Sequence, residues 1–344
     1  MGDPLMRLAI VGAGWAGQRQ ATALSELAGE IQLTCLVDND AAHLNMVAAE
    51  LGVDDVRQDL RQVLEDDEID AVSLCTPHAL HAAQAIAAAE AGKHVLVEKP
   101  MALSVEEASA MIDAAETHGV RLYVAESATY QPMSGFLRDV VRSGRHIGEM
   151  VAATVCSGFR APDYGYPARR AWLAQPDQGG TGTWMLHGIH TVAQLRHVFG
   201  DVAAVYAHQH RAASFKPAQI EATMSLQLTL RSGTSVHLLQ SSEVKFAGTL
   251  GGYTIFGDRG SLQADASGCR FIDDAGKQEL VKYPEMAHSE YAQEMAAFAT
   301  WVRDGVEGPT TGIAERRSLA IVQAGYESAA SGDAVDLDAR FGRL

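Results

Sequence analysis

Cysteine is scarce in this sequence, and long apolar runs are absent. No Cys-x-x-Cys pair occurs, and no histidine spacing typical of a zinc site accompanies the cysteines. We therefore expect reduced thiols, no disulfide framework and no metal. No apolar stretch approaches the roughly 20 residues that span a bilayer, and Met1 to Arg7 leaves no room for a signal peptide before the first apolar run. These absences favour a cytoplasmic protein. The cysteines are Cys35, Cys75, Cys156 and Cys269.

Positive charge is also in short supply. The chain has 27 lysines and arginines against 43 aspartates and glutamates, a formal charge of −16. A protein of this sign repels phosphate backbones and anionic lipid surfaces, so we expect no nucleic acid partner and no membrane partner. With 344 residues, of which 47% are hydrophobic, the chain is long for one core and fits two globular domains.

A glycine-rich loop follows the first apolar run. The run Arg7 to Val11 leads into the letters G-A-G-W-A-G, the pattern G-x-G-x-x-G, and a predicted helix ends near Gly29. The pattern alone is weak in a chain with 32 glycines, but its place between a strand and a helix is typical of a dinucleotide site. The loop residues expected to contact the pyrophosphate at the helix N-terminus are Gly12, Gly14, Trp15, Ala16 and Gly17.

An aspartate marks the end of the second predicted strand. Asp38 follows Ile31 to Val37, where a carboxylate can accept the ribose hydroxyls of the adenosine half. It would repel a 2′-phosphate, and no lysine or arginine occurs in the following Asn39-Asp40-Ala41, so we expect NAD rather than NADP. In the alternative interpretation, Asp38 caps the next helix.

Further strand, turn and helix units follow. Ala71 to Cys75 is followed by the turn Thr76-Pro77 and a helix from His81 to Ala91. Ser104 begins another predicted helix, which ends at Gly119 before a strand from Val120 to Ala125. This alternation predicts a parallel, doubly wound Rossmann sheet. His81 lies close to this turn and either contacts a ligand or is a solvated or capping residue.

Glu98-Lys99-Pro100 ends the apolar run Val95 to Val97. A lysine at the carboxyl end of a strand in such a sheet points into the ligand crevice. Partial burial and a positive nicotinamide ring would lower its pKa toward the working range, and Glu98 would orient the ammonium group. The alternative is a surface salt bridge with a proline that ends the strand.

With these motifs in view, the chain resembles the Gfo/Idh/MocA oxidoreductase family. The resemblance rests on the glycine loop, Asp38, the Thr76-Pro77 turn with His81, the stretch from Ala91 to Pro100, and the stretch from Tyr291 to Ala330. It implies a Rossmann domain over residues 1–127 and, over residues 128–344, an α+β domain with a large open mixed sheet. It also implies bound NAD(P), Lys99 as the acid/base and substrate-orienting residue, a Lys99-Pro100 bond that is often cis, and a homodimer or homotetramer.

From about Gly148 onward, the sequence is rich in segments with the pattern of β-strands. One broad sheet is predicted, which would form the floor of the pocket and offer its outer face to another subunit. Its predicted strands are Glu149 to Ser157, Ala203 to His210, Thr223 to Leu230, Thr234 to Ser241, and Gly252 to Phe256.

A second glycine-rich segment, from Gly179 to Gly182, precedes His190. By resemblance, His190 stands at the family's histidine position, and Leu186 stands one helical turn earlier where relatives commonly have an aspartate. We expect His190 to act with Lys99 as a general acid/base, against the alternative of a packed core histidine. His187 is expected near the pocket edge, and two histidines without a carboxylate make a poor metal site.

Other residues are assigned by resemblance or by charge. Trp172 stands where relatives often carry a Trp-Arg pair, and here Leu173 replaces the arginine. An arginine fork nearby would clamp an acidic substrate, although solvated loop charges are an equal alternative. Core packing is likewise an alternative for the two tyrosines at family positions near the pocket. The arginines are Arg160, Arg169 and Arg170, and the tyrosines are Tyr130 and Tyr291.

Together these features predict a dehydrogenase or reductase that moves a hydride between a nicotinamide and a secondary alcohol or ketone of a sugar, cyclitol or cyclic diol. Two alternatives remain open: an enzyme that retains NAD and cleaves glycosides, and a non-catalytic NAD-binding regulatory protein. Beyond the loop, the residues expected to contact the cofactor are Asp38, Asn39, Thr76, Pro77, His81, Glu98, Lys99, Trp172 and Tyr291.

Overall fold

A computed structural model describes residues 5–158, 172–173, 175–179, 183–213, 221–244, 246 and 250–343 of the chain. The chain separates into two compact units. The first comprises Met1–Tyr130 and Ala287–Arg316, and the second comprises Gln131–Met286 and Arg317–Leu344. The sequence predicted a single boundary between residues 127 and 128. That division needs correction, because the chain returns to the first unit for residues 287–316.

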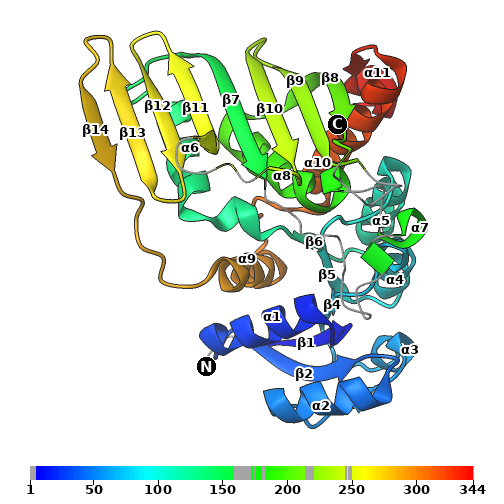
Figure 1. Ribbon diagram of the computed structural model, residues 1–344. Coiled ribbons are helices and arrows are strands. Elements are labelled where there is room, and N and C mark those ends of the chain that lie inside the picture. Colours follow the sequence, from blue (N-terminus) through cyan, green and yellow to red (C-terminus); the bar gives the residue numbers. More distant parts are fainter. Residues whose placement is uncertain are drawn as a thin grey trace. The chain divides into compact units, whose positions relative to one another are not determined.

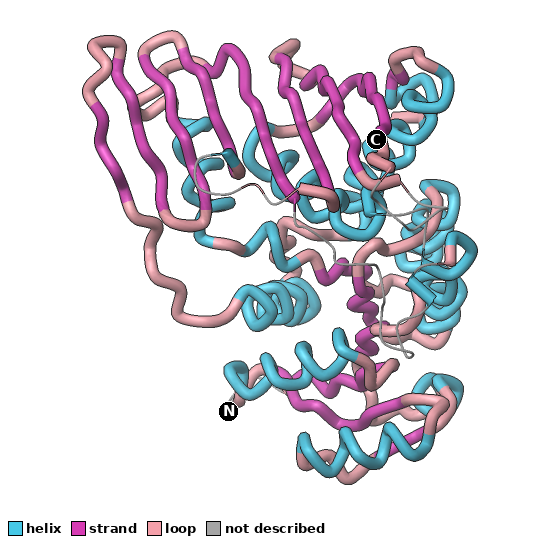
Figure 2. Tube along the Cα trace, viewed as in Figure 1, coloured by secondary structure: helices cyan, strands magenta, loops and turns pink. Residues whose placement is uncertain are grey.

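In its described residues, the first unit contains a six-stranded sheet in the order β3-β2-β1-β4-β5-β6, and its strand pairs are parallel. Figure 2 shows strands and helices alternating along this part of the chain. The predicted doubly wound Rossmann sheet is confirmed, with its switch point between β1 and β4. The strands are β1 (Met6–Val11), β2 (Ile31–Val37), β3 (Val56–Arg57), β4 (Ala71–Leu74), β5 (His94–Glu98) and β6 (Leu122–Ala125). The helices are α1 (Trp15–Ala23), α2 (Ala41–Leu51), α3 (Leu60–Leu64), α4 (His78–Glu90), α5 (Val105–Thr117) and α9 (Glu290–Asp304).

Side-chain caps fix where these helices begin. Ser104 caps α5 by accepting a hydrogen bond from the Glu107 amide at 3.1 Å, as the sequence predicted. Asp40 caps α2 by accepting from the His43 amide at 3.1 Å. The alternative interpretation of Asp38 as that cap is therefore wrong. Helix α4 begins at His78 rather than at His81, because Pro77 occupies its N-cap position.

The returning segment 287–316 completes the core of the first unit. The fully buried Tyr123 ring of β6 stacks on Phe298 of α9 at 6.0 Å and packs obliquely on Trp301 at 5.8 Å. Thr310 donates its backbone N–H to the Tyr123 hydroxyl at 3.4 Å. Residues 287–316, from the C-terminal third of the chain, therefore form part of the core of the nucleotide-binding unit.

In the described part of the second unit, nine strands form a mixed sheet in the order β14-β13-β12-β11-β7-β10-β9-β8-β15. Strands β7 and β10 are parallel, and the other neighbours are antiparallel. The predicted broad mixed sheet is confirmed. Its strands are β7 (Met150–Gly158), β8 (Val202–His210), β9 (Thr223–Leu230), β10 (Ser235–Ser241), β11 (Gly252–Gly257), β12 (Gly260–Asp265), β13 (Gly268–Asp273), β14 (Gln278–Val281) and β15 (Val335–Asp336). The helices are α6 (Pro132–Ser143), α7 (Pro176–Gly179), α8 (Ile189–Phe199), α10 (Gly312–Ser331) and α11 (Leu337–Phe341), and a π-helix spans Trp184–Gly188.

Strict alternation gives this sheet two unlike faces. In β9, Met224, Leu226 and Leu228 are buried, whereas the residues between them are exposed. Helices α6, α8 and α10 cover the apolar face (Figure 1). Tyr206 and Phe256 are exposed on the sheet. The predicted use of the outer face in a homodimer or homotetramer stays a prediction. Among the described helices, none has both the length and the apolarity that crossing a membrane requires.

Candidate active site

The glycine loop fits a dinucleotide. Gly12 has φ of +102°, and a Cβ on it would lie 2.4 Å from the carbonyl oxygen of Cys75, so another residue would be strained and would clash. Around Gly14, by contrast, no atom lies within 4 Å of a Cβ position, which leaves room for a ligand to approach the backbone. In the described part of the chain no side chain caps helix α1, and its first turn has no acidic residue, so its N-terminus suits an anion.

Asp38 is held in place by two backbone groups. Its Oδ2 accepts from the Ala13 amide at 3.0 Å, and its Oδ1 accepts from the Asp40 amide at 2.9 Å. The carboxylate therefore joins the glycine loop to the start of α2 at the carboxyl end of β2. Asn39 beside it is exposed. This position suits the predicted contact with the adenosine ribose.

The Glu98-Lys99-Pro100 corner lies at the carboxyl end of β5. The Lys99-Pro100 bond is cis, as the resemblance implied, and Lys99 is partly buried. Glu98 accepts from the Lys99 amide at 3.3 Å through Oε2 and from Gln20 Nε2 at 2.9 Å through Oε1. Burial raises the pKa of Glu98 to about 7, although the positive charge of Lys99 opposes the rise. That Glu98 orients the lysine ammonium stays a prediction.

The predicted turn after β4 lies beside this corner. Thr76 donates its hydroxyl to Gln84 Oε1 at 2.5 Å. The ring of His81 is fully buried, with Nδ1 at 3.0 Å from the Pro100 oxygen and Nε2 at 2.9 Å from the Thr76 oxygen. The structure therefore brings the glycine loop, Asp38, the Thr76-Pro77 turn and Lys99 to one edge of the parallel sheet.

Two buried glutamates near this edge escaped the sequence analysis. Glu294 of α9 is fully buried, and neither of its carboxyl oxygens has a hydrogen-bond partner among the residues that the structure describes. Glu126 follows β6 and is also fully buried. Burial raises the pKa of Glu294 well above its ordinary value, and the charges of Glu98 and Glu126 add to the rise. Glu294 lies three residues after Tyr291, on the helix that the resemblance had marked.

We expect the Glu294→Met variant to be more stable than the wild type at pH 8, with a smaller gain at pH 5. The folded chain holds a proton on Glu294 above the unfolded pKa near 4.5, so unfolding releases that proton. The free energy of unfolding of the wild type therefore falls as the pH rises above about 4.5. Urea unfolding at several pH values measures the effect. Gln293→Met is the matched control on the same helix, and an equal pH dependence in both variants would contradict the assignment.

His190 is the second residue of α8 and is partly exposed. The segment before it is a π-helix, so the prediction that Leu186 lies one α-helical turn from His190 needs correction. The Trp184 ring packs directly on Gly188, where a Cβ would lie 2.1 Å from the ring. Leu186 itself is buried.

A carboxyl group missed by the sequence analysis caps this π-helix. Glu221 accepts a short hydrogen bond from the Trp184 amide and another from the Tyr326 hydroxyl at 3.1 Å. Burial raises the pKa of Glu221 to about 7, against the opposing effect of these donors. The acid that supports the helix of His190 thus comes from a segment distant in the sequence.

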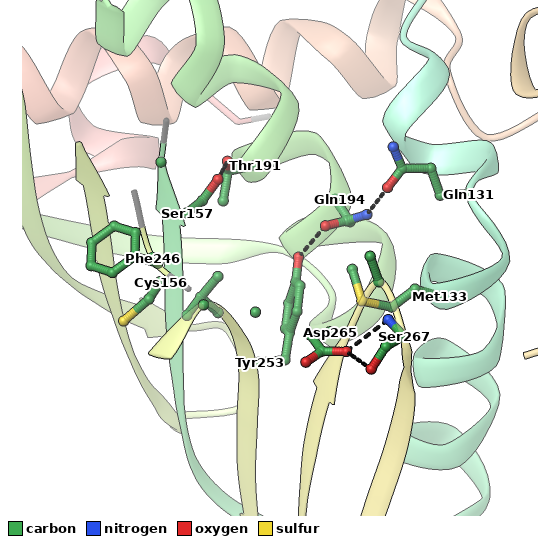
Figure 3. A pocket seen from close by; sticks show the side chains of 15 residues that line it. Gln131, Met133, Cys156, Ser157, Thr191, Gln194, Phe246, Tyr253, Asp265 and Ser267 are labelled. Atoms are coloured by element: carbon green, nitrogen blue, oxygen red, sulfur yellow. Dashed lines mark hydrogen bonds between the residues drawn. The ribbon is translucent and has the colours of Figure 1, made fainter. Parts of the chain in front are cut away.

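The second unit also contains a cavity of about 570 Å³, beside the turn that follows His190. Figure 3 shows Tyr253, Gln194 and Gln131 joined across its wall. Tyr253 donates to Gln194 Oε1 at 2.8 Å, and Gln194 donates to Gln131 Oε1 at 3.2 Å. Elsewhere on the wall, Thr191 Oγ1 lies 3.1 Å from Ser157 Oγ and 3.1 Å from Oε1 of Gln240 behind the wall. The sequence analysis missed these residues, although Gln194 lies four residues after His190 on one helix.

The remaining predicted residues have varied surroundings. Tyr130 places its hydroxyl 2.5 Å from that of Tyr123, and burial raises the pKa of both tyrosines. Burial also raises the pKa of Tyr291. His187 and Trp172 are partly buried. Arg160, Arg169 and Arg170 lie outside the described residues. In the portion of the chain that the structure covers, no group of three or more histidine, cysteine or acidic residues is arranged to hold a metal.

Comparison with known proteins bears on both units. Residues 6–126 match the oxidoreductase family with an NAD-binding Rossmann fold, and residues 136–263 match the GFO/IDH/MocA C-terminal domain. The chain is 29% identical to D-xylose 1-dehydrogenase (NADP(+)) 2 of Haloferax volcanii over 97% of its length and 100% of that protein. It is 36% identical to scyllo-inositol 2-dehydrogenase (NAD(+)) of Bacillus subtilis over 127 residues, 37% of each chain.

Solved structures of oxidoreductases share the fold of this chain. An oxidoreductase from Agrobacterium radiobacter, solved with NAD⁺, L-tartaric acid and magnesium, superposes with a TM-score of 0.86 at 23% identity, covering 98% of this chain and 100% of that one. The nucleotide-binding edge, the mixed sheet and the two family matches agree, and the protein therefore belongs to the Gfo/Idh/MocA oxidoreductases, a family of dehydrogenases and reductases that bind NAD through a Rossmann fold.

Proposed function

We propose that this enzyme oxidises a secondary alcohol of an uncharged sugar or cyclitol to the ketone, or reduces that ketone, with Lys99 and His190 handling the hydroxyl proton. The observation that carries the proposal is the partly buried lysine at the carboxyl end of β5, on the same sheet edge as the dinucleotide loop. Relatives named for D-xylose and scyllo-inositol support the substrate class.

In this proposal, separate residues bind the cofactor and exchange the substrate proton. The glycine loop and the N-terminus of α1 would hold the pyrophosphate, and Asp38 would hold the adenosine ribose. When bound, the nicotinamide supplies hydride chemistry at its carbon 4. Lys99 accepts the proton of the substrate hydroxyl during oxidation and returns it during reduction. His190 is the second proposed acid/base group, because the two nitrogens of an imidazole can donate and accept a proton.

The cavity of the second unit is the proposed substrate site. Its wall carries hydroxyl and amide groups from Ser157, Thr191 and Gln194, which can both donate and accept hydrogen bonds. Such a wall suits the many hydroxyls of a polyol. Thr191 follows His190 directly, which places the proposed acid/base group next to a residue of the wall.

A panel of sugars and cyclitols that includes D-xylose and scyllo-inositol tests the function, assayed by nicotinamide absorbance with NAD and NADP in both directions. We expect turnover with at least one member. Binding of NAD without any absorbance change would contradict the proposal. Release of nitrophenol from a nitrophenyl glycoside without net NADH would favour the glycoside-cleaving alternative instead.

Asp38→Ala should change cofactor preference. Loss of a charged acceptor costs about 1.5 to 3 kcal/mol, so we expect the Kd for NAD to rise about tenfold or more. The Kd for NADP should fall, because the variant no longer repels a 2′-phosphate. Asp40→Ala is the matched control: it removes the cap of α2 and should leave both Kd values nearly unchanged. Stronger binding of NADP than NAD by the wild type would contradict the role of Asp38.

A further inference from the structure

The side chain of His81 touches two segments of the proposed active site at once. Its Nδ1 lies 3.0 Å from the carbonyl oxygen of Pro100, the residue after Lys99. Its Nε2 lies 2.9 Å from the carbonyl oxygen of Thr76, in the turn after β4. The exposed fraction of His81 is 0%, and the His78 ring packs obliquely beside it at 5.5 Å.

Both contacts require a hydrogen-bond donor on the imidazole ring. Both partners are carbonyl oxygens, which only accept, whereas a neutral imidazole has one N–H to donate. Burial lowers the pKa of His81 to about 4 despite the two carbonyl groups, so the ring is neutral at pH 7. The ring can therefore donate to only one of the two carbonyl groups at a time.

Burial decides which carbonyl receives the proton. The contact with Pro100 is fully buried, whereas the contact with Thr76 is only partly buried. Water can reach a partly buried carbonyl, but a fully buried one that loses its donor costs about 1 to 3 kcal/mol. The proton is therefore favoured on Nδ1, where it binds Pro100.

We propose that His81 is a positioning residue for Lys99. The Nδ1–H of His81 holds the carbonyl of Pro100 and so fixes the backbone from which the lysine side chain extends toward the substrate. The inference rests on the proposed function, in which Lys99 exchanges the substrate proton. A displacement of about 1 Å at such a group can cost about 100-fold in rate.

Two substitutions separate the two ring nitrogens. In His81→Asn the amide nitrogen stands close to the place of Nδ1, and in His81→Gln it reaches toward the place of Nε2. We expect His81→Asn to keep kcat within about fivefold of the wild type, and His81→Gln to lower kcat about 30-fold or more with little change in the Kd for NAD. The assay uses D-xylose or scyllo-inositol, whichever turns over faster in the panel.

His94→Gln is the matched control. His94 lies at the opposite end of β5, where its Nδ1 accepts from the Arg121 amide at 3.0 Å, and burial lowers its pKa. The kcat of His94→Gln should stay close to that of the wild type even if the melting temperature of this variant falls. If the two His81 variants lose kcat equally, in step with their melting temperatures, the role of His81 is structural only and the proposal is overturned.

Lys99→Met, assayed in parallel, separates this inference from the proposed function. An inactive Lys99→Met together with a fully active His81→Gln would overturn the positioning role and leave the proposed function standing. An active Lys99→Met would contradict both the positioning role of His81 and the proposed role of Lys99. The proposal stands if Lys99→Met is inactive and only the Gln variant of His81 loses kcat.

Discussion

Lys99→Met should bind NAD nearly as well as the wild type and lose turnover by a factor of about 10² to 10⁴, the range expected for loss of a general acid/base group. Methionine keeps the length and apolar body of the side chain, so the change removes mainly the amine, to which we assign the proton exchange. Lys99 lies at the end of β5, apart from the glycine loop that would hold the pyrophosphate. Cofactor fluorescence measures binding, and initial rates on the panel substrate measure turnover.

Two further variants refine this test. Lys99→Arg keeps the positive charge but cannot release its proton, so it should be nearly as inactive as Lys99→Met if proton exchange is the role. Lys93→Met is the control, since the Lys93 ammonium donates to the Asp66 and Ile69 carbonyls at 2.6 and 2.9 Å, near the amino end of β5. That variant should lose stability and keep kcat. Substantial turnover by Lys99→Met would show that another group moves the proton.

Gly12→Ala should damage both the fold of the first unit and its cofactor site. A non-glycine residue at positive φ costs about 1 to 2 kcal/mol, and overpacking costs about 1 to 3 kcal/mol more. The atom in the way is the backbone oxygen of Cys75 in the turn after β4, which cannot rotate aside as a side chain would. We therefore expect a melting temperature several degrees lower and a large loss of NAD affinity.

Gly14→Ala is the matched comparison in the same loop. Open space surrounds its Cβ position, so the protein without cofactor should keep its melting temperature. The new methyl group would stand where the pyrophosphate is expected, and the Kd for NAD should rise. The test compares the melting temperatures of Gly12→Ala and Gly14→Ala. Equal values for the two variants would contradict the packing explanation of Gly12.

The first half of the fold was predictable because each of its signals is local. A strand, a glycine loop and a helix N-terminus follow one another within the first 23 residues, and Asp38 and Lys99 follow buried strands directly. The carboxyl ends of parallel strands meet at one edge of a sheet, so their order along the chain was enough to bring these residues together.

The residues that sequence analysis missed depend on contacts between distant segments. Glu221 caps the π-helix of Trp184 from 37 positions away, and Tyr253 reaches Gln194 across 59. Helical periodicity does not reveal the π-helix before His190, nor the packing of the Trp184 ring on Gly188 within it. The sequence analysis also missed strands β12 to β14, although each of them pairs with its neighbours along the chain.

The return of residues 287–316 to the first unit has a consequence for recombination between relatives. Tyr123 packs on Phe298 and Trp301, so a fragment cut after Tyr130 would leave an aromatic ring and much of a core surface without their cover. Exchanging the second unit between two family members at a single crossover would split this core between parents. Chimaeras that exchange whole units need three crossovers, near residues 130, 287 and 317, so that α9 stays with its own Rossmann sheet and residues 317–344 stay with the second unit.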